Sequence, residues 1–309
     1  MNVAETTIVG KRYSLLRERL SHDIERLRKF TAVLIKNRLA FAGIVIIAFF
    51  TVMSFGAPLL VGPYPSQLQR TTDNLPPSSA HWLGTDWEGF DILTLLVYGG
   101  QISLIIGFSA SIVAMVLGTA VGVVGGFYGG ITDLILARMT DFFLVIPWLP
   151  FVLVLVIILT PSLATIILAI AIVSWPSTAR VIRSQVLTVK ERQFIERSRA
   201  VGARPSFIVR KHIIPNVMPL VWAEAVLTVS NSVFTEAFLS FFGLGPSGPD
   251  VIRSWGVLVN ESYIHLALVQ GHWWYFGPPG LFITVVVLGF AMLGYGLEDV
   301  MNPALRRRR

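Results

Sequence analysis

Four side chains between positions 81 and 91 have the chemistry to bind a metal ion: His81, Asp86, Glu88 and Asp91. Imidazole nitrogens and carboxylate oxygens are zinc ligands, and zinc sites use short, recurring spacings between them. These residues fit none of those spacings, and no second histidine lies nearby in the sequence. We therefore expect no metal site in this chain.

The sequence lacks the motifs of three other kinds of catalytic site. There is no cysteine, which excludes thiolate catalysis and disulfides. No Gly-x-x-x-x-Gly-Lys-[Ser/Thr] phosphate loop is present, and the single Gly-Lys pair, Gly10–Lys11, lies in a charged segment. All histidines lie outside the long apolar stretches, at His22, His81, His212, His265 and His272. We expect neither an ATPase nor a membrane-embedded enzyme.

Two glutamates lie within long apolar stretches, where a charge is costly and is a functional candidate. Glu236 lies near one end of its stretch, and Glu224 lies nearer the other end. Glu236 could line a pathway for a ligand, or it could pair with a neighbouring helix. The sequence leaves both interpretations open.

A basic island, Ile195–Asn216, separates two of the most apolar stretches. Its cations are Arg197, Arg199, Arg204, Arg210 and Lys211. Gly202 can take a positive φ and end a first helix, and Pro205 suits the first turn of a second helix. The pattern predicts a short helix–turn–helix elbow. A loop that only marks one side of a membrane requires no elbow, whereas a docking surface for a partner does.

The elements that must position these residues are membrane helices. The chain has 309 residues, 54% hydrophobic and 14% charged, with a mean hydropathy of +0.68. In soluble domains, about 45–50% of residues are apolar and about 25% are charged. The stretches long enough to cross about 30 Å of hydrocarbon as helices are residues 39–61, 102–127, 142–159, 163–182, 213–242 and 278–297. The predicted fold class is an all-α integral membrane protein with six transmembrane helices.

The distribution of cations predicts the orientation, because Lys and Arg collect on the cytoplasmic side of membrane proteins. With the N-terminus inside, 23 of the 25 Lys and Arg lie on the inner side, and the other two are Arg70 and Arg253. Both termini are therefore predicted to be cytoplasmic. The net charge of +7 follows from this distribution, and no aromatic residues interleave the cations. We expect contact with anionic lipid and no nucleic-acid partner.

Small residues and prolines mark the packing of the predicted spans. The second span carries glycines at four-residue intervals, at Gly118, Gly122, Gly126 and Gly130. This spacing predicts one helix face on which a neighbour packs closely. Prolines interrupt the third and fourth spans, at Pro147, Pro150, Pro161 and Pro176. Such breaks are tolerated where neighbours or water satisfy the freed carbonyls, which suggests a lined cavity.

The basic island resembles the EAA loop of ABC-transporter membrane subunits. That loop reads Glu-Ala-Ala-x-x-x-Gly, followed at a fixed distance by apolar-x-apolar-Pro. Glu196, Gly202 and Pro215 stand at the matching positions, whereas Arg197 and Ser198 replace the two alanines.

Other stretches are similar to the second permease of dipeptide, oligopeptide and nickel importers. They include "HWLGTDWEGFDILTLLVYGGQISLIIG", "VSWPSTARVIRSQVL" and "EAFLSFFGLG", and the likeness extends over roughly residues 30–305. Near the C-terminus, Tyr295 and Asn302 stand where the family more often has Asp.

The resemblance implies a type I ABC importer permease in a prokaryotic cell membrane. It implies a heterodimer with a second permease, two cytoplasmic ATPases that bind ATP and Mg²⁺, and an extracytoplasmic substrate-binding protein. No cofactor is expected in this chain. The family's EAA loop inserts into a groove on an ATPase, and the corresponding residues here are Ile195, Glu196, Arg199, Ala200, Val201, Gly202, Ala203 and Pro215.

The expected organisation is a charged cytoplasmic segment (1–38), the first span (39–61), an extracytoplasmic region (62–98), the permease core (99–300) and a basic tail (301–309). Within the core, residues 190–215 form the coupling loop and residues 243–277 an extracytoplasmic loop. Peptides are the expected substrate, with oligosaccharides or nickel as alternatives. An ion-coupled carrier is a distant alternative, because the sequence shows neither an inverted repeat nor several mid-span charges.

Overall fold

All regular elements in the described part of the chain are helices. The computed structural model describes residues 31, 33–65, 71–246 and 251–301. Within these residues, five helices are long and apolar enough to cross a membrane, and a sixth span results if one bent helix pair is counted as a span. The all-α membrane fold predicted from the sequence is confirmed. Most of the charged N-terminal segment and nearly all of the basic tail lie outside the described residues.

The helices account for most of the described chain. In chain order they are α2 (Arg38–Phe55), α3 (Ala57–Leu60), α4 (Ile92–Tyr128), α5 (Gly130–Val145), α6 (Trp148–Leu159), α7 (Leu163–Lys190), α8 (Gln193–Ala200), α9 (Pro205–Ile208), η2 (Val209–Ile213), α10 (Ile214–Leu239), η3 (Ser240–Leu244), α11 (Trp255–Ile264) and α12 (Trp273–Met301).

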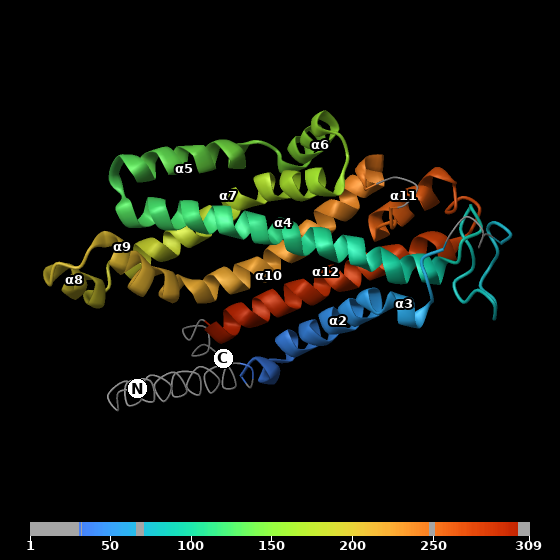
Figure 1. Ribbon diagram of the computed structural model, residues 1–309, viewed down its shortest axis with the longest axis horizontal. Helices are drawn as coiled ribbons and strands as arrows, with labels where there is room; N and C mark the ends of the chain where they lie inside the picture. The colour runs from blue at the N-terminus through green and yellow to red at the C-terminus, as the bar shows by residue number, and fades with distance from the viewer. Residues whose placement is uncertain (1–30, 32, 66–70, 247–250, 302–309) are drawn as a thin grey trace, which may run out of the picture.

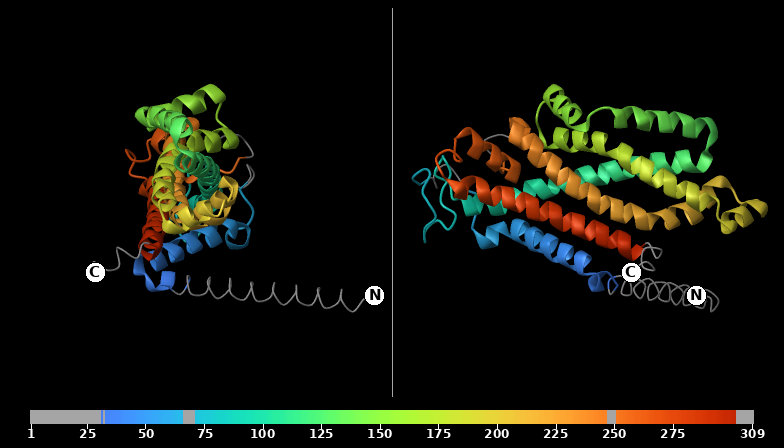
Figure 2. Two further views of the ribbon diagram at one scale, coloured as in Figure 1. Left: turned by 90° about the vertical axis from the view of Figure 1, so that its left-hand side faces the viewer. Right: turned by 180° about the vertical axis from the view of Figure 1, so that it is seen from behind.

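The long helices lie side by side along the long axis of the molecule (Figures 1 and 2). Helix α4 packs along α7 and α10, and α12 packs along α2 and α10. Helices α8 and α9 lie at one end, which we call the elbow end, and residues 71–91 lie at the other, the loop end (Figure 1). The basic island and the segment with metal-ligand chemistry are therefore at opposite ends of the bundle.

Helix α4 is longer than the sequence predicted. It begins at Ile92 rather than near residue 102, because the Asp91 carboxylate accepts a hydrogen bond of 2.8 Å from the N–H of Thr94 and caps the helix. Its 37 residues extend about 55 Å at a rise of about 1.5 Å per residue. The helix therefore extends well beyond about 30 Å of hydrocarbon.

The third predicted span is broken. Helix α5 ends at Val145, and α6 begins at Trp148 with a bend of 89° between the two helices. Ile146 takes an extended backbone, with φ −70° and ψ 128°, because a following proline disfavours the helical conformation and Pro147 has no N–H for a helical bond. The residues between the second and third predicted spans, 128–141, are mostly helix α5.

Three of the four predicted glycines face α7. A Cβ atom would lie 2.7 Å from the carbonyl oxygen of Trp175 at Gly118, 2.7 Å from that of Ala179 at Gly122, and 3.1 Å from that of Arg183 at Gly126. Gly130 was wrongly placed on this face. Helix α4 ends at Tyr128, and Gly130 begins α5 with φ +56° and no neighbour within 4 Å of a Cβ position.

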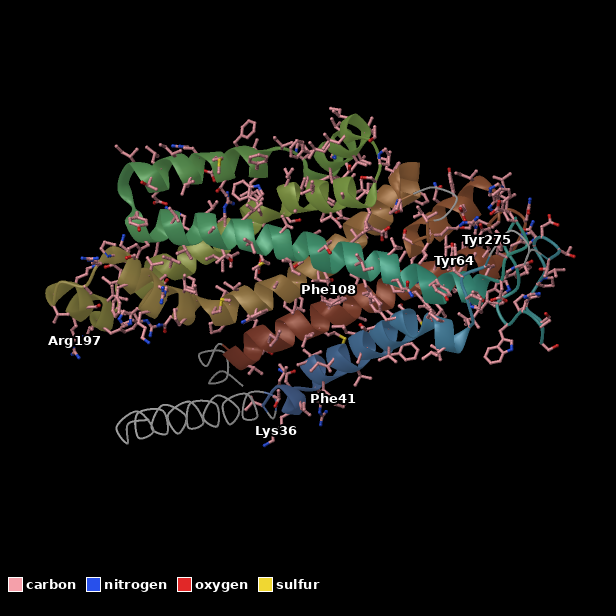
Figure 3. The ribbon with its side chains drawn as sticks, viewed as in Figure 1. Lys36, Phe41, Tyr64, Phe108, Arg197 and Tyr275 are labelled. Carbon is pink, nitrogen blue, oxygen red and sulfur yellow. The ribbon has the colours of Figure 1, made fainter. Side chains whose placement is uncertain are left out.

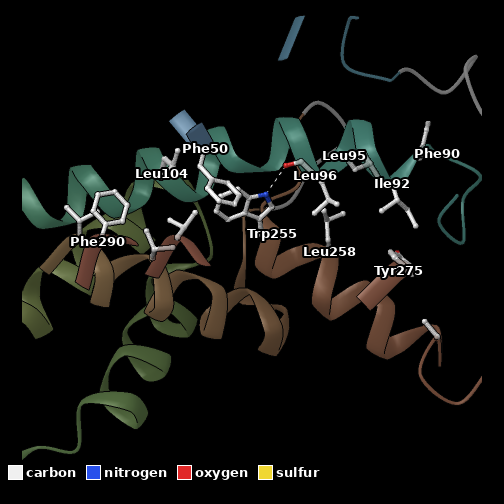
Figure 4. Packing of buried hydrophobic residues seen from close by; sticks show 14 residues of the cluster. Phe50, Phe90, Ile92, Leu95, Leu96, Leu104, Trp255, Leu258, Tyr275 and Phe290 are labelled. Carbon is white, nitrogen blue, oxygen red and sulfur yellow. Dashed lines mark hydrogen bonds between the residues drawn. The ribbon is translucent and has the colours of Figure 1, made fainter. Parts of the chain in front are cut away.

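An aromatic cluster holds the helices together toward the loop end (Figure 4). Trp255 is fully buried, and its indole N–H donates a hydrogen bond of 2.8 Å to the carbonyl of Leu96. The ring of Phe50 packs edge-on against Trp255, with 5.7 Å between centroids. Leu258 and Tyr275 belong to the same cluster, which therefore joins α2, α4, α11 and α12.

Candidate functional site

The basic island forms the predicted helix–turn–helix elbow. We call residues 190–215 the elbow. Helix α8 ends at Ala200, Gly202 takes φ +79°, and Pro205 occupies the first turn of α9. The N–H of Ala203 donates a hydrogen bond of 3.1 Å to the carbonyl of Ser198, which closes the end of α8. A left-handed residue at this place strongly favours glycine.

Apolar contacts anchor the elbow to the bundle. Ile195 of α8, Ile208 of α9 and Ile213 of η2 are buried in one cluster with Val186 and Val189 near the end of α7. The elbow is therefore packed against the membrane helices on both of its arms. Ile195 is fully buried within this chain, so its inclusion among the residues that contact a partner is corrected.

The opposite side of the elbow is exposed. Val201 is 84% exposed although it is apolar. The other predicted contact residues that are exposed are Glu196, Arg199, Ala200, Gly202 and Pro215, whereas Ala203 is half-buried. Arg197, on the same helix as Glu196, lies at the extreme of the elbow end (Figure 3). Apart from Ile195 and Ala203, the predicted contact residues are thus accessible to solvent at the elbow.

Two further apolar side chains, Phe194 and Phe207, are exposed at the elbow. Both rings lie 5.9 Å from the ring of His212, measured between centroids. Their exposure was not predicted from the sequence, because aromatic residues among charges are usually core residues. The feature that indicates exposure is the short length of the element, which has too few apolar neighbours to bury both rings.

Glu236 is fully buried and completely surrounded by this chain. Its carboxylate accepts hydrogen bonds from Ser103 on α4, at 2.9 Å, and from Ser240 of η3, at 2.7 Å. The hydroxyl of Ser240 is in turn 3.4 Å from that of Ser254, which caps α11. These contacts fit the structural-pairing interpretation of Glu236. A pathway role for it stays a prediction without support from its contacts.

The residues with metal-ligand chemistry have other partners. His81 Nδ1 lies 3.0 Å from a carboxylate oxygen of Asp91, the residue that caps α4. Asp86 is fully buried and accepts hydrogen bonds from the N–H groups of Glu88 and Phe90. Among the described residues, no group of three or more His, Cys, Asp or Glu could hold a metal ion.

Arg253 joins two loops that are far apart in the sequence. Its guanidinium donates to Asp86 at 2.9 Å, to Glu261 at 3.2 Å and to Glu88. We call these four residues the Arg253 cluster. Tyr64 and Tyr275 lie at the same end of the molecule (Figure 3), where the Tyr275 hydroxyl is 3.5 Å from Glu261. The cluster connects residues 71–91 with the segment around α11.

Burial affects two carboxyl groups of the Arg253 cluster. Burial raises the pKa of Glu261 to about 7, and the attraction of Arg253 opposes this shift only partly. Burial also raises the pKa of Asp86, against hydrogen bonds from backbone N–H groups and the charge of Arg253. Glu261 therefore exchanges a proton near neutral pH.

Comparison with known proteins gives consistent similarities. Residues 114–307 match a family described as "Binding-protein-dependent transport system inner membrane component", and residues 26–77 match "N-terminal TM domain of oligopeptide transport permease C". The chain is 38% identical over 272 residues to the dipeptide transport system permease protein DppC of Bacillus subtilis (strain 168), across 88% of this chain and 84% of that protein.

A second relative and a solved structure were also found. The chain is 38% identical over 276 residues to the oligopeptide transport system permease protein OppC of the same strain, across 88% of this chain and 87% of that protein. A solved structure of the MetNI methionine ABC transporter in an inward-facing conformation matches with a TM-score of 0.49 and 23% identity, over 70% of this chain and 96% of that chain.

Proposed function

Since the chain belongs to the binding-protein-dependent inner-membrane transport components, and is a permease subunit of an ABC importer, we propose that it imports di- and oligopeptides and receives its driving force through the elbow. The chain is a multi-pass membrane protein. Peptides are proposed because the two Bacillus subtilis relatives are named for dipeptide and oligopeptide transport. Oligosaccharides and nickel remain the alternatives.

The exposed surface of the elbow is the observation that carries the proposal. It combines apolar side chains, among them Val201 and Phe207, with the cations Arg197, Arg199, Arg204 and Arg210. An exposed apolar patch rimmed by charges is typical of a protein–protein interface. The buried side of the elbow holds this surface in place, so that force on it reaches α7 and α10.

We propose that one of two ATPases binds this surface, that the ATPases hold the ATP and Mg²⁺, and that this chain itself catalyses no reaction. A second permease completes the pathway, and an external binding protein delivers the substrate. The elbow end then faces the cytoplasm, as do both termini, which agrees with the predominance of cations on that side. Closure of the ATPases would rock the bundle between inward- and outward-facing states.

Cross-linking tests the docking role directly. The chain has no cysteine, so a single Val201→Cys variant gives one defined attachment point in this subunit. We expect a short reagent that is thiol-reactive at one end and photoreactive at the other to join it to an ATPase subunit of the full importer. Trp82→Cys is the control, because Trp82 is 71% exposed but lies near the loop end. Equal yields of the ATPase adduct from both variants, or none from Val201→Cys, would exclude elbow docking.

Uptake into proteoliposomes tests the energy source and the substrate. We expect ATP-dependent accumulation of radiolabelled tri-alanine by the importer with its binding protein. Accumulation without ATPases on a proton or sodium gradient would support the ion-coupled carrier instead. Failure to transport tri-alanine, with transport of an oligosaccharide or of nickel, would replace the proposed substrate while retaining the importer.

A further inference from the structure

A cavity of about 510 Å³ lies between the α5–α6 break, α7 and α10, away from both the elbow and the Arg253 cluster. This volume is within the range of about 300–1,000 Å³ that is usual for small-molecule sites. Phe143, Trp148 and Phe234 supply part of its lining. The lining also includes seven polar residues, which is unexpected for the middle of membrane helices.

The polar lining comes from two helix faces. On α10 it consists of Glu224, Thr228, Asn231 and Thr235, whose spacing of four, three and four residues places them on one face. On α7 it includes Ser174, Ser177 and Thr178. Polar groups at membrane depth are costly and are found facing cavities or one another. Two such faces around one cavity indicate a place where polar ligand groups are accommodated.

Glu224 and Glu236 lie on the same helix but have opposite surroundings. The Glu236 carboxylate is occupied by two serine hydroxyls. Glu224 lines the cavity, and within the described residues its carboxylate has neither a hydrogen bond nor an ion pair. A partly buried carboxylate without a partner is unfavourable. The protein thus presents an unsatisfied acidic group to whatever occupies the cavity.

The end of α5 adds to the preference for a positive ligand. Leu144, Val145 and Ile146 line the cavity at the point where α5 stops. The last carbonyl groups of a helix have no partner within the helix and carry a partial negative charge. Among the residues that line this cavity in the described chain, none is a lysine, an arginine or a histidine.

We propose that this cavity is a binding subsite of the translocation pathway, in which Glu224 pairs with the α-ammonium group of a peptide and Asn231 hydrogen-bonds to its backbone. This inference rests on the proposed transport of peptides. The aromatic residues accommodate side chains of varied size, and the polar groups bind the parts that all peptides share. The subsite therefore recognises a free amino terminus rather than a particular sequence.

The test uses a cysteine inside the cavity, introduced at Ser177 because serine and cysteine differ by one atom and Ser177 is exposed there. In the full importer, its thiolate reacts with a methanethiosulfonate, forming a mixed disulfide and releasing methanesulfinate. The probes are the 2-aminoethyl reagent, which is cationic, and the 2-sulfonatoethyl reagent, which is anionic. Each rate is normalised to the rate of the same reagent with a small free thiol.

We expect Ser177→Cys to react about tenfold or more faster with the cationic probe, because a nearby carboxylate attracts it in a medium of low polarity. This preference should fall to about twofold or less when Glu224→Gln is added. Asp73→Asn is the control, since Asp73 is exposed at the loop end and is not part of the cavity lining. Tri-alanine should slow the reaction, and N-acetyl-tri-alanine should not.

The outcomes separate this inference from the proposed function. No reaction at Ser177→Cys, or equal rates for the two probes with and without Glu224, would overturn the subsite. If the wild type transports tri-alanine but tri-alanine gives no protection, the peptide assignment of the subsite is overturned. If the wild type does not transport tri-alanine but the cation preference depends on Glu224, the substrate proposal fails and a cation-selective subsite stands.

Discussion

Ile195 and Ile208 lie on the two arms of the elbow, on either side of the Gly202 turn, and both are buried in the same apolar cluster. The turn brings them together, and their burial fixes the angle between the arms. The contact surface and the anchoring surface are therefore different sides of one small element. This separation allows the two roles to be tested independently.

We expect Ile195→Ala to loosen the elbow, because truncation of a fully buried isoleucine costs about 2–5 kcal/mol. Hydrogen–deuterium exchange of residues 193–213 in the detergent-solubilised permease should rise. Val201→Ala is the matched variant: Val201 is 84% exposed, so exchange should stay unchanged while binding of the ATPase weakens. Faster exchange in Val201→Ala, or unchanged exchange in Ile195→Ala, would contradict the assignment of the two sides.

Gly202→Leu should uncouple ATP hydrolysis from transport while the protein still inserts. A leucine at φ +79° costs on the order of 1–2 kcal/mol and changes the angle of the turn. The measurement is the amount of tri-alanine transported per ATP hydrolysed. Gly62→Leu is the control, since Gly62 also has φ +79° and open space around its Cβ position but lies toward the loop end. Similar transport ratios in both variants would remove the special role of the turn.

The contact of α4 with α7 should not tolerate even one added methyl group at its centre. A Cβ atom at Gly122 would lie 2.7 Å from the carbonyl oxygen of Ala179, which is backbone and cannot rotate away. We expect Gly122→Ala to cost about 1–3 kcal/mol, seen as a lower midpoint of thermal unfolding. Gly280→Ala, on α12 with no atom within 4 Å of the Cβ position, should leave the midpoint unchanged or higher. Equal midpoints would disprove the tight contact.

Glu236 should matter for assembly of the bundle rather than for transport. In Glu236→Leu, the buried hydroxyls of Ser103 and Ser240 lose their acceptor, at about 1–3 kcal/mol for each unsatisfied group. We expect a clear drop in the thermal midpoint of Glu236→Leu and a smaller one for Glu236→Gln, which keeps one oxygen. Transport per ATP in Glu236→Gln should equal that of the wild type. A selective loss of transport in that variant would instead favour a pathway role.

The Arg253 cluster should weaken as the pH rises through the acidic range. The pKa of Glu261 is about 7 in the folded protein against a reference value of 4.5. Between these two pH values, the folded arrangement of the cluster therefore binds more protons than a locally opened one in which Glu261 is exposed to water. The folded arrangement of the cluster is therefore most stable below about pH 4.5, loses about 3 kcal/mol as the pH rises to about 8, and changes little above that. The raised pKa of Asp86 acts in the same direction.

Exchange of residues 255–264 between pH 5 and pH 8, corrected for intrinsic amide rates, measures this opening. We expect protection to fall with rising pH in the wild type. In Glu261→Gln, which cannot ionise, the dependence should largely disappear. A wild-type protection that rises with pH would show that the sign of the pKa shift is wrong.

The elements set by local chemistry were predictable from the sequence. Long apolar stretches required membrane helices, and Gly202 with Pro205 specified the elbow. What could not be predicted depended on tertiary neighbours. Ile195 reads as a surface residue in a charged helix, and only the position of α7 shows that it is buried. The start of α4 was not predicted, because hydropathy assigns the polar segment before residue 102 to a loop. The helix begins there because Asp91 caps its first turn.

The candidate site was predictable to the same degree. The elbow followed from the spacing of its residues, and the residues proposed to contact an ATPase followed from the resemblance. The Arg253 cluster, by contrast, joins residues far apart in the sequence: Arg253 is 167 residues from Asp86 and 165 from Glu88. Nothing in either segment alone indicates that pairing. Likewise, the same helix carries Glu224 and Glu236, and only the packing of neighbouring helices distinguishes the satisfied carboxylate from the unsatisfied one.

The uninterrupted length of α4 has a mechanical consequence. The helix begins at the residue after Asp91, next to the loops tied by Arg253, and its other end packs near η2 at the base of the elbow. A helix is stiff along its axis because every turn is closed by hydrogen bonds, so α4 cannot absorb a displacement by stretching. When α4 rotates about a point within the bundle, its two ends therefore move in opposite directions.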